Sequence, residues 1–427
     1  MTMTDTASAP PAAEVDAAAV RAEVEAFCDE HWDPDATVEQ WWRHLAGAGY
    51  AHPMLPAGAG GLGYGQDQAA LVSLVLAERN VLGPPGGLGR MLAAPTIAIH
   101  GTPEQVERYV GEILDGRVGW CQLFSEPNAG SDLASLQCRA ERDGDEWVIT
   151  GQKVWTSGGQ VADRGMLLAR TDPDLPKHAG ISWFAFDMDQ PGVEVRPLTE
   201  MTGRALFNEV FIDEARVAGS ALIGGLNNGW RVGNTTLMVE RASLGSSGRK
   251  PPELIPGPKG GVLGERAGNF VARPMEALGG VPPLGIDMWW WLVDLARKNG
   301  SVTSKVLRDD LMRLYGLIEI NRLSIQRAKS GSTSAAAPNI AKLTMSELNR
   351  SFRDIGMRVV GADGMLMGDS DSQTGGHIGE VALFSPAPSI YGGTDQVQRN
   401  IIGERVLGLP KEPGPPRETP FSELPKN

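Results

Sequence analysis

Two runs of polar and glycine residues carry the strongest chemical signal in this chain. FSEPNAGSD covers residues 124–132, and GQKVWTS follows at residues 151–157. Both runs place Ser or Thr hydroxyls and backbone N–H groups beside Pro, Gly or the broad indole of Trp155. A planar, electron-accepting ring needs such surroundings, with polar atoms around its rim and an apolar wall against one face. The runs hold neither the paired carboxylates of glycosyl transfer nor a phosphate-binding loop.

A third run near the C-terminus, YGGTDQVQRNIIGERVLGLP at residues 391–410, completes a family pattern. In order and separation, the three runs resemble the signatures of the acyl-CoA dehydrogenase family, whose organisation can be followed over about residues 15–410. The resemblance implies an FAD-containing enzyme that oxidises an acyl-CoA thioester to trans-2-enoyl-CoA. It also implies that flavin N5 accepts the β-hydride and that an electron-transfer flavoprotein reoxidises the cofactor.

The resemblance assigns the flavin contacts to all three runs and to two further positions. Ser125 and Ser131 correspond to hydroxyl residues that line the flavin or the adjoining substrate, and Trp155 to an aromatic residue packed beside the flavin. Ser157 corresponds to a hydroxyl near the N5 and O4 edge, where a donor stabilises negative charge on the reduced ring. The residues expected to bind the cofactor are Phe124, Ser125, Gly130, Ser131, Trp155, Thr156, Ser157, Arg297, Gly361, Thr394 and Gln396.

Four of these residues correspond to family positions outside the first two runs. Arg297 matches an arginine that meets the FAD pyrophosphate of a neighbouring subunit. The Asn-Gly at residues 299–300 departs from the family's aromatic-Gly ending, so an ordinary solvated arginine near a helix end is the alternative. Thr394 and Gln396 correspond to residues that approach the dinucleotide across a subunit boundary, and Thr394 also suits a helix N-cap. Gly361 begins a turn that parallels one near the adenylate.

The expected catalytic base is displaced in this chain. Removal of the α-proton needs a carboxylate, which many relatives supply directly after the Tyr of the third run. Gly392 holds that position here, whereas Glu240 falls where long-chain and isovaleryl-CoA dehydrogenases keep their base on a helix. We therefore expect Glu240 to accept the α-proton, the alternative being a solvated surface carboxylate. The backbone N–H of Gly392 is expected to hold the thioester oxygen.

Three residues are expected to contact the substrate: Ser131, Arg241 and Tyr391. A structural role for Arg241 and a packed core position for Tyr391 are equally compatible with the sequence. The displaced base is compatible with long, branched or ring-bearing acyl groups, and the sequence does not distinguish among them. The resemblance implies a homotetramer or an α2β2 heterotetramer with a related chain.

Two other functions fit the same motifs. One is an oxidase, or a nitroalkane-oxidising flavoprotein, although the latter would favour an Asp base, which neither residue 240 nor residue 392 provides. The other is a non-catalytic subunit that completes the FAD site of a partner chain. Rapid reoxidation of the flavin by O2 would favour the first alternative, and activity that appears only on co-expression with a partner would favour the second.

The elements that must position these residues follow an α+β order. Apolar residues at helical intervals predict helices over residues 15–117 and again after residue 227, while short β-rich runs between them predict an antiparallel barrel or sandwich. Thr102, with Gln105 three residues on, predicts a capped helix start. The expected organisation is a lead-in at 1–14, a helical domain at 15–117, a β domain at 118–226, a helical bundle at 227–412 with an insertion at 247–287, and a tail at 413–427.

The insertion at residues 247–287 is rich in Gly and Pro and interrupts what would otherwise be continuous helix. It is compatible with a mobile surface loop, a wall of the acyl pocket or a subunit contact. Three consecutive tryptophans follow at residues 289–291. Since they cannot all face one side of a helix, we expect at least one to meet the insertion or a partner subunit.

Composition excludes several classes of function. The net charge is −13 and no run is rich in Lys or Arg, which argues against a nucleic-acid partner. No apolar run approaches the roughly 18 residues that cross a bilayer. The N-terminus lacks a basic segment followed by an apolar one, so no secretory signal is predicted. Three cysteines without CxxC spacing and six scattered histidines predict neither disulfides nor a metal site, as in a cytoplasmic protein.

Overall fold

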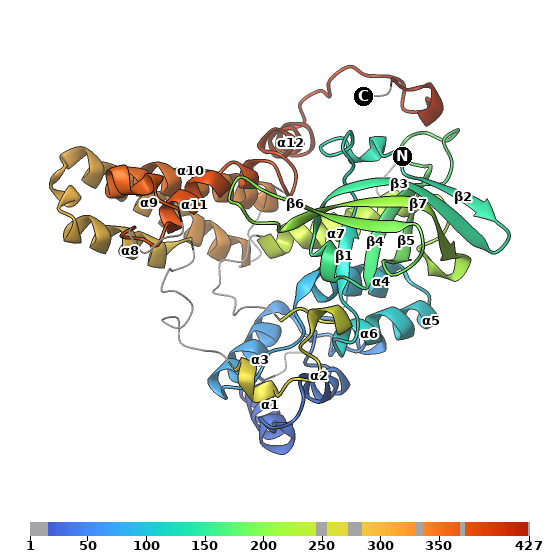
Figure 1. Cartoon of the computed structure of the whole chain (residues 1–427), viewed down its shortest axis with the longest axis horizontal. Coiled ribbons are helices and arrows are strands. Elements are labelled where there is room, and N and C mark those ends of the chain that lie inside the picture. The colour runs from blue at the N-terminus through green and yellow to red at the C-terminus, as the bar shows by residue number, and fades with distance from the viewer. Residues whose placement is uncertain (1–15, 245–253, 272–283, 330–335, 368–371, 426–427) are drawn as a thin grey trace.

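The computed structural model describes residues 16–244, 254–271, 284–329, 336–367 and 372–425. N-terminal helices lie below a central sheet, and the C-terminal helices extend to one side of it (Figure 1). This arrangement confirms the predicted α+β class with helices, then strands, then helices. The predicted lead-in at residues 1–14 lies outside the described residues.

Short amphipathic helices build the N-terminal part. Their bounds are α1 Ala17–His31, α2 Val38–Gly47, α3 Gln66–Glu78, α4 Ala94–His100, α5 Pro103–Gln105 and α6 Gly111–Leu114. Thr102 accepts a hydrogen bond from the backbone N–H of Gln105, as the predicted capping box requires. Trp41 and Trp42 of α2 are buried, and their indole N–H groups donate to main-chain carbonyls. These helices form one core with the sheet.

One connected sheet forms the middle of the molecule. Its strands are β1 Trp120–Leu123, β2 Arg139–Asp143, β3 Glu146–Ser157, β4 Arg164–Arg170, β5 Ile181–Asp187, β6 Val193–Leu198, β7 Phe207–Ala218 and β8 Leu222–Ile223. The order is β6-β7-β3-β2-β4-β5-β8, and β1 lies against β4. Most pairings are antiparallel as expected, but β4 pairs in parallel with β1 and β2. The long connections that separate these strands along the chain permit that pairing.

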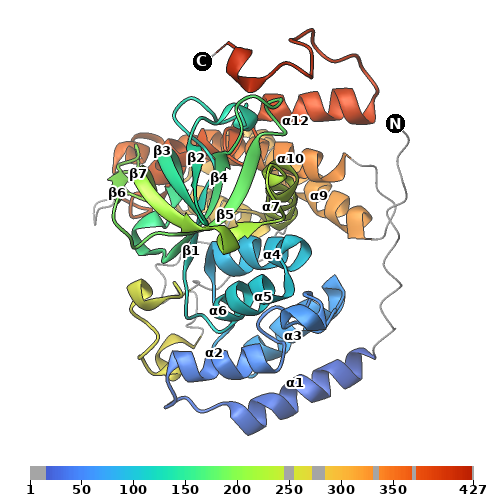
Figure 2. The same ribbon diagram turned by 90° about the vertical axis from the view of Figure 1, so that its right-hand side faces the viewer.

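The C-terminal helices are α7 Gly229–Leu244, α8 Ile286–Lys298, α9 Lys305–Lys329, α10 Ala337–Val360, α11 His377–Phe384 and α12 Asp395–Ile401, the last continued by a π-helical turn at Ile402–Val406. Helix α7 runs beside the sheet and contacts β5, α4 and α10 (Figure 2). Helices α8, α9, α10 and α11 enclose a second core. Within it Trp289 is buried, whereas Trp290 is exposed, so the three consecutive indoles do not share a face.

The described part of the predicted insertion packs against the N-terminal helices. Figure 2 shows residues 254–271 (yellow) beside α2. The backbone N–H of Val38 donates to the carbonyl of Glu265 at 2.9 Å, and that of Ala267 donates to the carbonyl of Ala36 at 2.8 Å. In this part, paired backbone groups and apolar side chains packed against the core attach the segment to the N-terminal helices, and its role stays a prediction. The remainder of the insertion before residue 284 lies outside the described residues.

Among the helices that the structure describes, none combines the length and apolar character required to cross a bilayer.

Candidate functional site

The two polar runs that dominate the sequence lie side by side. Strand β1 leads into the loop at residues 124–132, and the second run occupies the end of β3. The backbone N–H of Val154 donates to the carbonyl of Ser125 at 2.9 Å. Lys153 Nζ donates to the carbonyl of Phe124 at 3.2 Å and to Glu126 Oε1 at 2.8 Å. The tertiary structure thus joins the two runs through main-chain and charged contacts.

Lys153 and Glu126 form an ion pair in the core beneath this junction, with exposed fractions of 0% and 8%. The ammonium also donates to the carbonyl of Leu168 at 2.7 Å. Glu126 accepts two more bonds, from the backbone N–H groups of Gln137 at 2.7 Å and Cys138 at 2.9 Å. Sequence reasoning missed both residues. The available signal was the opposite charge of the two residues, one within each of the two family runs.

A β-bulge turns Trp155 out of the sheet. Trp155 has φ +61° and is 62% exposed, and the pairing of β3 with β7 shifts register between Lys153 and Thr156. Ser157 is exposed on the same face, whereas the side chain of Thr156 is buried, and its Oγ1 has no hydrogen-bond partner among the described residues. Trp155 and Ser157 therefore suit a planar ligand, and Thr156 can offer such a ligand only its backbone.

The loop at residues 124–132 presents its polar end to solvent. Glu126 and Ala129 exchange backbone hydrogen bonds of 3.0 and 3.1 Å, which closes a tight turn. Gly130 and Ser131 follow it and are exposed. The Phe124 side chain is buried in the core, so its contribution to a ligand site is limited to the positioning of its neighbours.

The predicted base, Glu240, is half-buried on α7 near the end of β1. Burial raises the pKa of its carboxyl, while a hydrogen bond from Gln122 and the charge of Arg241 partly oppose that rise. Gln122 lies on β1, two residues before Phe124. Gln122 is a third residue that sequence reasoning missed, since nothing in the pattern of β1 indicates its partner. A carboxylate with a raised pKa beside the strand that enters the first polar run is suited to proton abstraction.

Polar contacts fix α7 at its position beside the sheet. Thr236 Oγ1 lies 3.0 Å from Thr96 Oγ1, and Thr235 Oγ1 lies 2.8 Å from His100 Nε2, so α7 is bonded to α4. Arg241 Nε donates to the carbonyl of Leu237 at 3.1 Å within the helix. Burial lowers the pKa of Arg241, the charge of Glu240 raises it, and that of Arg405 lowers it. The end of α7 therefore lies near the π-helical turn that follows α12.

The turn at residues 391–393 is built on glycine. Gly392 and Gly393 have φ of +64° and +79°, a region that L side chains adopt only with strain. Gln398 Nε2 donates to the carbonyl of Gly392 at 2.9 Å, and Gln398 Oε1 accepts a 2.6 Å bond from Asn339. Tyr391 is half-buried, and burial raises the pKa of its hydroxyl. A glutamate at residue 392 would therefore be strained in this backbone.

A buried charge network holds the helix after this turn. Thr394 accepts a hydrogen bond from the backbone N–H of Val397 at 3.2 Å, which confirms its predicted role as N-cap of α12. Asp395 is buried and accepts bonds from Lys342 at 3.1 Å and from Arg350 at 3.0 Å. The turn that carries Gly392 is thus fastened to α10.

The remaining predicted cofactor residues lie on the C-terminal helices or at their ends. Arg297 is exposed near the end of α8 and lies 3.2 Å from Asp294. Gly361 ends α10 with φ +60°, and Gln396 is exposed on α12. Because the resemblance assigns these residues to FAD contacts across a subunit boundary, their role stays a prediction.

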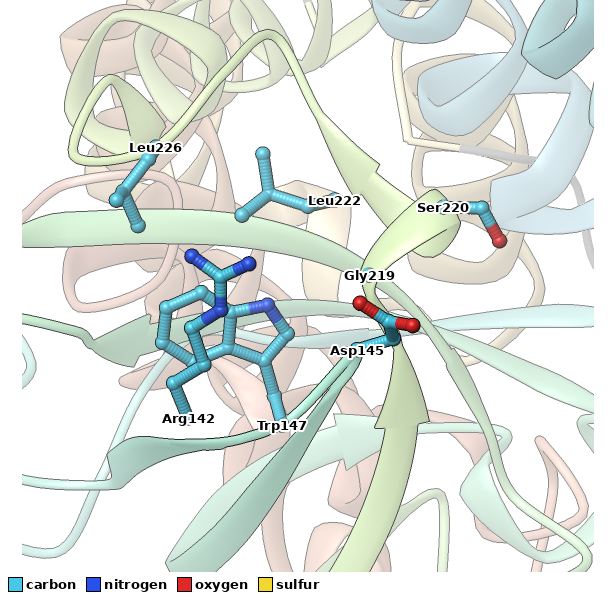
Figure 3. A pocket seen from close by; sticks show the side chains of 7 residues that line it. All are labelled: Arg142, Asp145, Trp147, Gly219, Ser220, Leu222 and Leu226. Carbon is cyan, nitrogen blue, oxygen red and sulfur yellow. The ribbon is translucent and has the colours of Figure 1, made fainter.

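A separate cavity of about 450 Å³ opens between the β2–β3 hairpin and the connection that carries β8 (Figure 3). Its lining residues are Arg142, Asp145, Trp147, Gly219, Ser220, Leu222 and Leu226. In Figure 3 the side chains of Arg142, Asp145 and Trp147 come from the hairpin side of the cavity. None of the predicted site residues lines it, so this cavity is distinct from the candidate active site.

Comparison with known protein families identifies the family to which the chain belongs. Models of the acyl-CoA dehydrogenase N-terminal, middle and C-terminal domains match residues 14–117, 121–214 and 294–407, respectively. The chain belongs to the acyl-CoA dehydrogenase family. Members of this family are flavoprotein oxidoreductases, generally FAD-dependent, and the dehydrogenation of acyl-CoA thioesters is therefore the general reaction of this chain.

Curated relatives support the same family. The acyl-CoA dehydrogenase IpdE1 of Mycobacterium tuberculosis is 34% identical over 374 residues, which cover 87% of this chain and 88% of that protein. The acyl-CoA dehydrogenase FadE34 of the same organism is 37% identical over 371 residues, which cover 86% of this chain and 46% of that protein. FadE34 is therefore about twice as long as the segment it shares with this chain.

Solved structures confirm the fold. The Tcur3481-Tcur3483 steroid ACAD superposes with a TM-score of 0.69 at 26% identity, covering 93% of this chain and 98% of that one. A chain of the ChsE4-ChsE5 complex from Mycobacterium tuberculosis superposes with a TM-score of 0.66 at 23% identity, covering 95% and 100% of the two chains. At 23% identity, the similarity to the ChsE4-ChsE5 chain establishes only the fold.

Proposed function

We propose that this acyl-CoA dehydrogenase uses Glu240 as the base that removes the α-proton of its substrate. The observation that carries the proposal is the environment of Glu240, a half-buried carboxylate with a raised pKa beside the strand that leads into the first polar run. A base is most effective when its pKa approaches the working pH. Burial on a helix provides this without the strained backbone that a glutamate at residue 392 would need.

The residues around Trp155 fit FAD as the cofactor. The exposed indole and the hydroxyl of Ser157 share one open face of β3, and the carbonyl of Ser125 is bonded to the backbone beside them. Trp155 would cover the flavin and Ser157 would donate a hydrogen bond to its rim. FAD, when bound, supplies the acceptor for the β-hydrogen, which leaves the substrate as hydride. An exposed indole held in the left-handed region indicates a ligand-binding surface.

The chain's own residues would carry out the proton transfer and hold the substrate. Glu240 would take the α-proton onto its carboxylate. Before the transfer, the hydrogen bond from the Gln122 side chain would favour the ionised carboxylate and fix its orientation. The backbone N–H of Gly392 would hold the thioester oxygen, which makes the α-carbon more acidic. Tyr391 and Arg241 would line the acyl cavity, and Ser131 would contact the substrate at the edge of the loop.

We further propose a bulky, ring-bearing acyl-CoA as substrate and a heterotetramer with a related chain as the assembly. The 26% identical Tcur3481-Tcur3483 protein is a steroid ACAD of two named components. The matched segment covers 46% of FadE34, so the rest of that polypeptide is long enough for a second unit of this size. An electron-transfer flavoprotein would accept the electrons, as the family resemblance implies, and a homotetramer is the alternative assembly.

Glu240→Gln tests the proposal because it deletes the proton acceptor and keeps the shape of the side chain. Turnover should fall by about 10²- to 10⁴-fold, while flavin content and acyl-CoA binding stay unchanged. A panel of acyl-CoAs with an artificial electron acceptor measures turnover, and the visible flavin spectrum measures binding. Glu209→Gln, on β7 and paired with Gln152, is the matched control. Near-normal turnover of Glu240→Gln would refute the assignment.

A further inference from the structure

The turn at Gly392 and Gly393 carries the proposed donor to the thioester oxygen. Both residues have positive φ, and glycine has more backbone freedom than any other residue. Among the residues that the structure describes, the backbone N–H of Gly392 has no hydrogen-bond acceptor, so it is free to donate to a ligand. A donor stabilises developing charge only when it is held in position beforehand. On so flexible a turn, another group must hold it.

Gln398, the fourth residue of α12, provides this restraint. Its Nε2 donates to the carbonyl of Gly392 at 2.9 Å and to that of Gly393 at 3.3 Å. These are the only hydrogen bonds that the backbone of the two glycines makes within the described part of the chain. A Cβ at residue 393 would lie 2.7 Å from Nε2, so glycine is needed there for the amide to approach the backbone this closely.

A second buried amide determines how Gln398 is oriented. The exposed fractions are 1% for Gln398 and 5% for Asn339 of α10, and Asn339 Nδ2 donates to Gln398 Oε1 at 2.6 Å. Because the two carbonyls of the turn can only accept, the Gln398 amide must direct its nitrogen to them and its oxygen to Asn339. Any other orientation would leave buried polar groups without partners, which is costly. A chain of hydrogen bonds therefore extends from α10 to the turn.

We propose that Gln398 is a positioning residue for the reaction, which holds the Gly392–Gly393 turn so that the N–H of Gly392 points at the thioester oxygen. The inference rests on the proposed role of that N–H and adds the group that fixes its direction. The oxygen gains negative charge as the α-proton leaves, so the N–H matters more in the transition state than in substrate binding. Loss of Gln398 should therefore lower kcat more than it raises KM.

Gln398→Met in the full-length, flavin-loaded protein tests this role, because it removes the amide and keeps the length of the side chain. The kcat for the best acyl-CoA should fall about tenfold, less than for complete loss of an oxyanion donor, since the N–H remains but is no longer held. KM and flavin content should stay nearly unchanged. Asn339→Leu should lower kcat by a smaller factor. Asn400→Leu, at an exposed position of α12, is the control and should leave kcat unchanged.

The infrared stretch of a bound thioester carbonyl measures the position of the donor without turnover. The probe is trans-2-decenoyl-CoA labelled with ¹³C at the carbonyl, an unsaturated thioester of the kind that the proposed reaction forms. Its stretch should shift to lower frequency on binding to the unmodified protein and to Asn400→Leu, and should shift less in Gln398→Met. A role of Gln398 in stability alone would leave this shift unchanged.

The outcomes separate this inference from the proposed function. An equal carbonyl shift in the unmodified protein and in Gln398→Met, or a raised KM with unchanged kcat, would overturn the positioning role alone. If the unmodified protein bound no probe or produced no shift, the proposed role of the Gly392 N–H would fail and the inference with it. If Glu240→Gln kept its turnover, the assigned base would be wrong, whereas the carbonyl shift would still decide on Gln398.

Discussion

Two opposing effects on the pKa of the Glu240 carboxyl decide at which pH it can act as a base. Burial on α7 raises its pKa above the ordinary value, and the hydrogen bond from Gln122 lowers it by stabilising the ionised form. Only the ionised carboxylate can accept a proton. Activity should therefore increase with pH as Glu240 ionises, and this increase should lie above the usual range for a glutamate.

Gln122→Met should move the acid limb of the kcat/KM profile to higher pH. The substitution removes a donor to the ionised carboxylate, so the pKa rises further and less base is available at a given acidic pH. At pH values well above this limb, turnover should change little. Steady-state kinetics across pH measure the effect, with Gln152→Met on β3 as the control. A limb that stays in place or moves to lower pH would contradict the assigned contact.

Between elements, the Lys153–Glu126 pair connects β3 to the loop that follows β1. Both groups are withdrawn from water, and every hydrogen-bonding position of the ammonium has an acceptor. A buried pair is costly to break because the remaining partner stays charged in the core. Since the pair lies directly beneath Trp155 and Ser125, it should also set the relative position of the two flavin-binding runs.

Lys153→Met should lower the free energy of unfolding by about 3 kcal/mol, since it leaves Glu126 as an uncompensated buried charge. Flavin content should fall as well, because the two runs lose their common anchor. The double variant Lys153→Met with Glu126→Gln should recover part of the stability, as it removes both charges. Urea unfolding and the flavin-to-protein absorbance ratio measure these effects. Wild-type values for the single variant would exclude an anchoring role.

At the scale of the whole molecule, residues 254–271 connect parts that are distant in sequence. This segment follows α7 in the chain but packs on α2 and the loop before it. Ala267 is fully buried there, and its backbone N–H is bonded to Ala36. The N-terminal helices are thus held by a segment that belongs, in chain order, to the C-terminal part.

Ala267→Glu should destabilise the protein by about 2 kcal/mol or more, because a charged side chain would enter a dry contact without a partner. Hydrogen exchange should increase in residues 34–47, which lie against this segment. Asn269→Glu, at an exposed position three residues from Arg266, is the matched control and should have little effect. If both variants unfolded at the same urea concentration, the docking of this segment would contribute nothing to stability.

Local features of the sequence determined the family, the order of helices and strands, and the helix caps at Thr102 and Thr394. These depend on neighbouring residues, through apolar periodicity and through side chains that reach backbone groups three positions away. The motif runs were likewise recognisable because each is contiguous. The left-handed backbone of Gly392 agrees with the loss of a side chain there.

The tertiary structure alone decided which distant residues meet. The pairing of Glu126 with Lys153, of Gln122 with Glu240 and of Arg170 with Phe421 joins groups that no spacing rule relates. The bulge that turns Trp155 outward and Thr156 inward depends on the register of β3 against β7. Burial and partner choice are properties of packing in three dimensions. The pKa of a carboxylate and the anchoring of a loop therefore become definite only when the chain is folded.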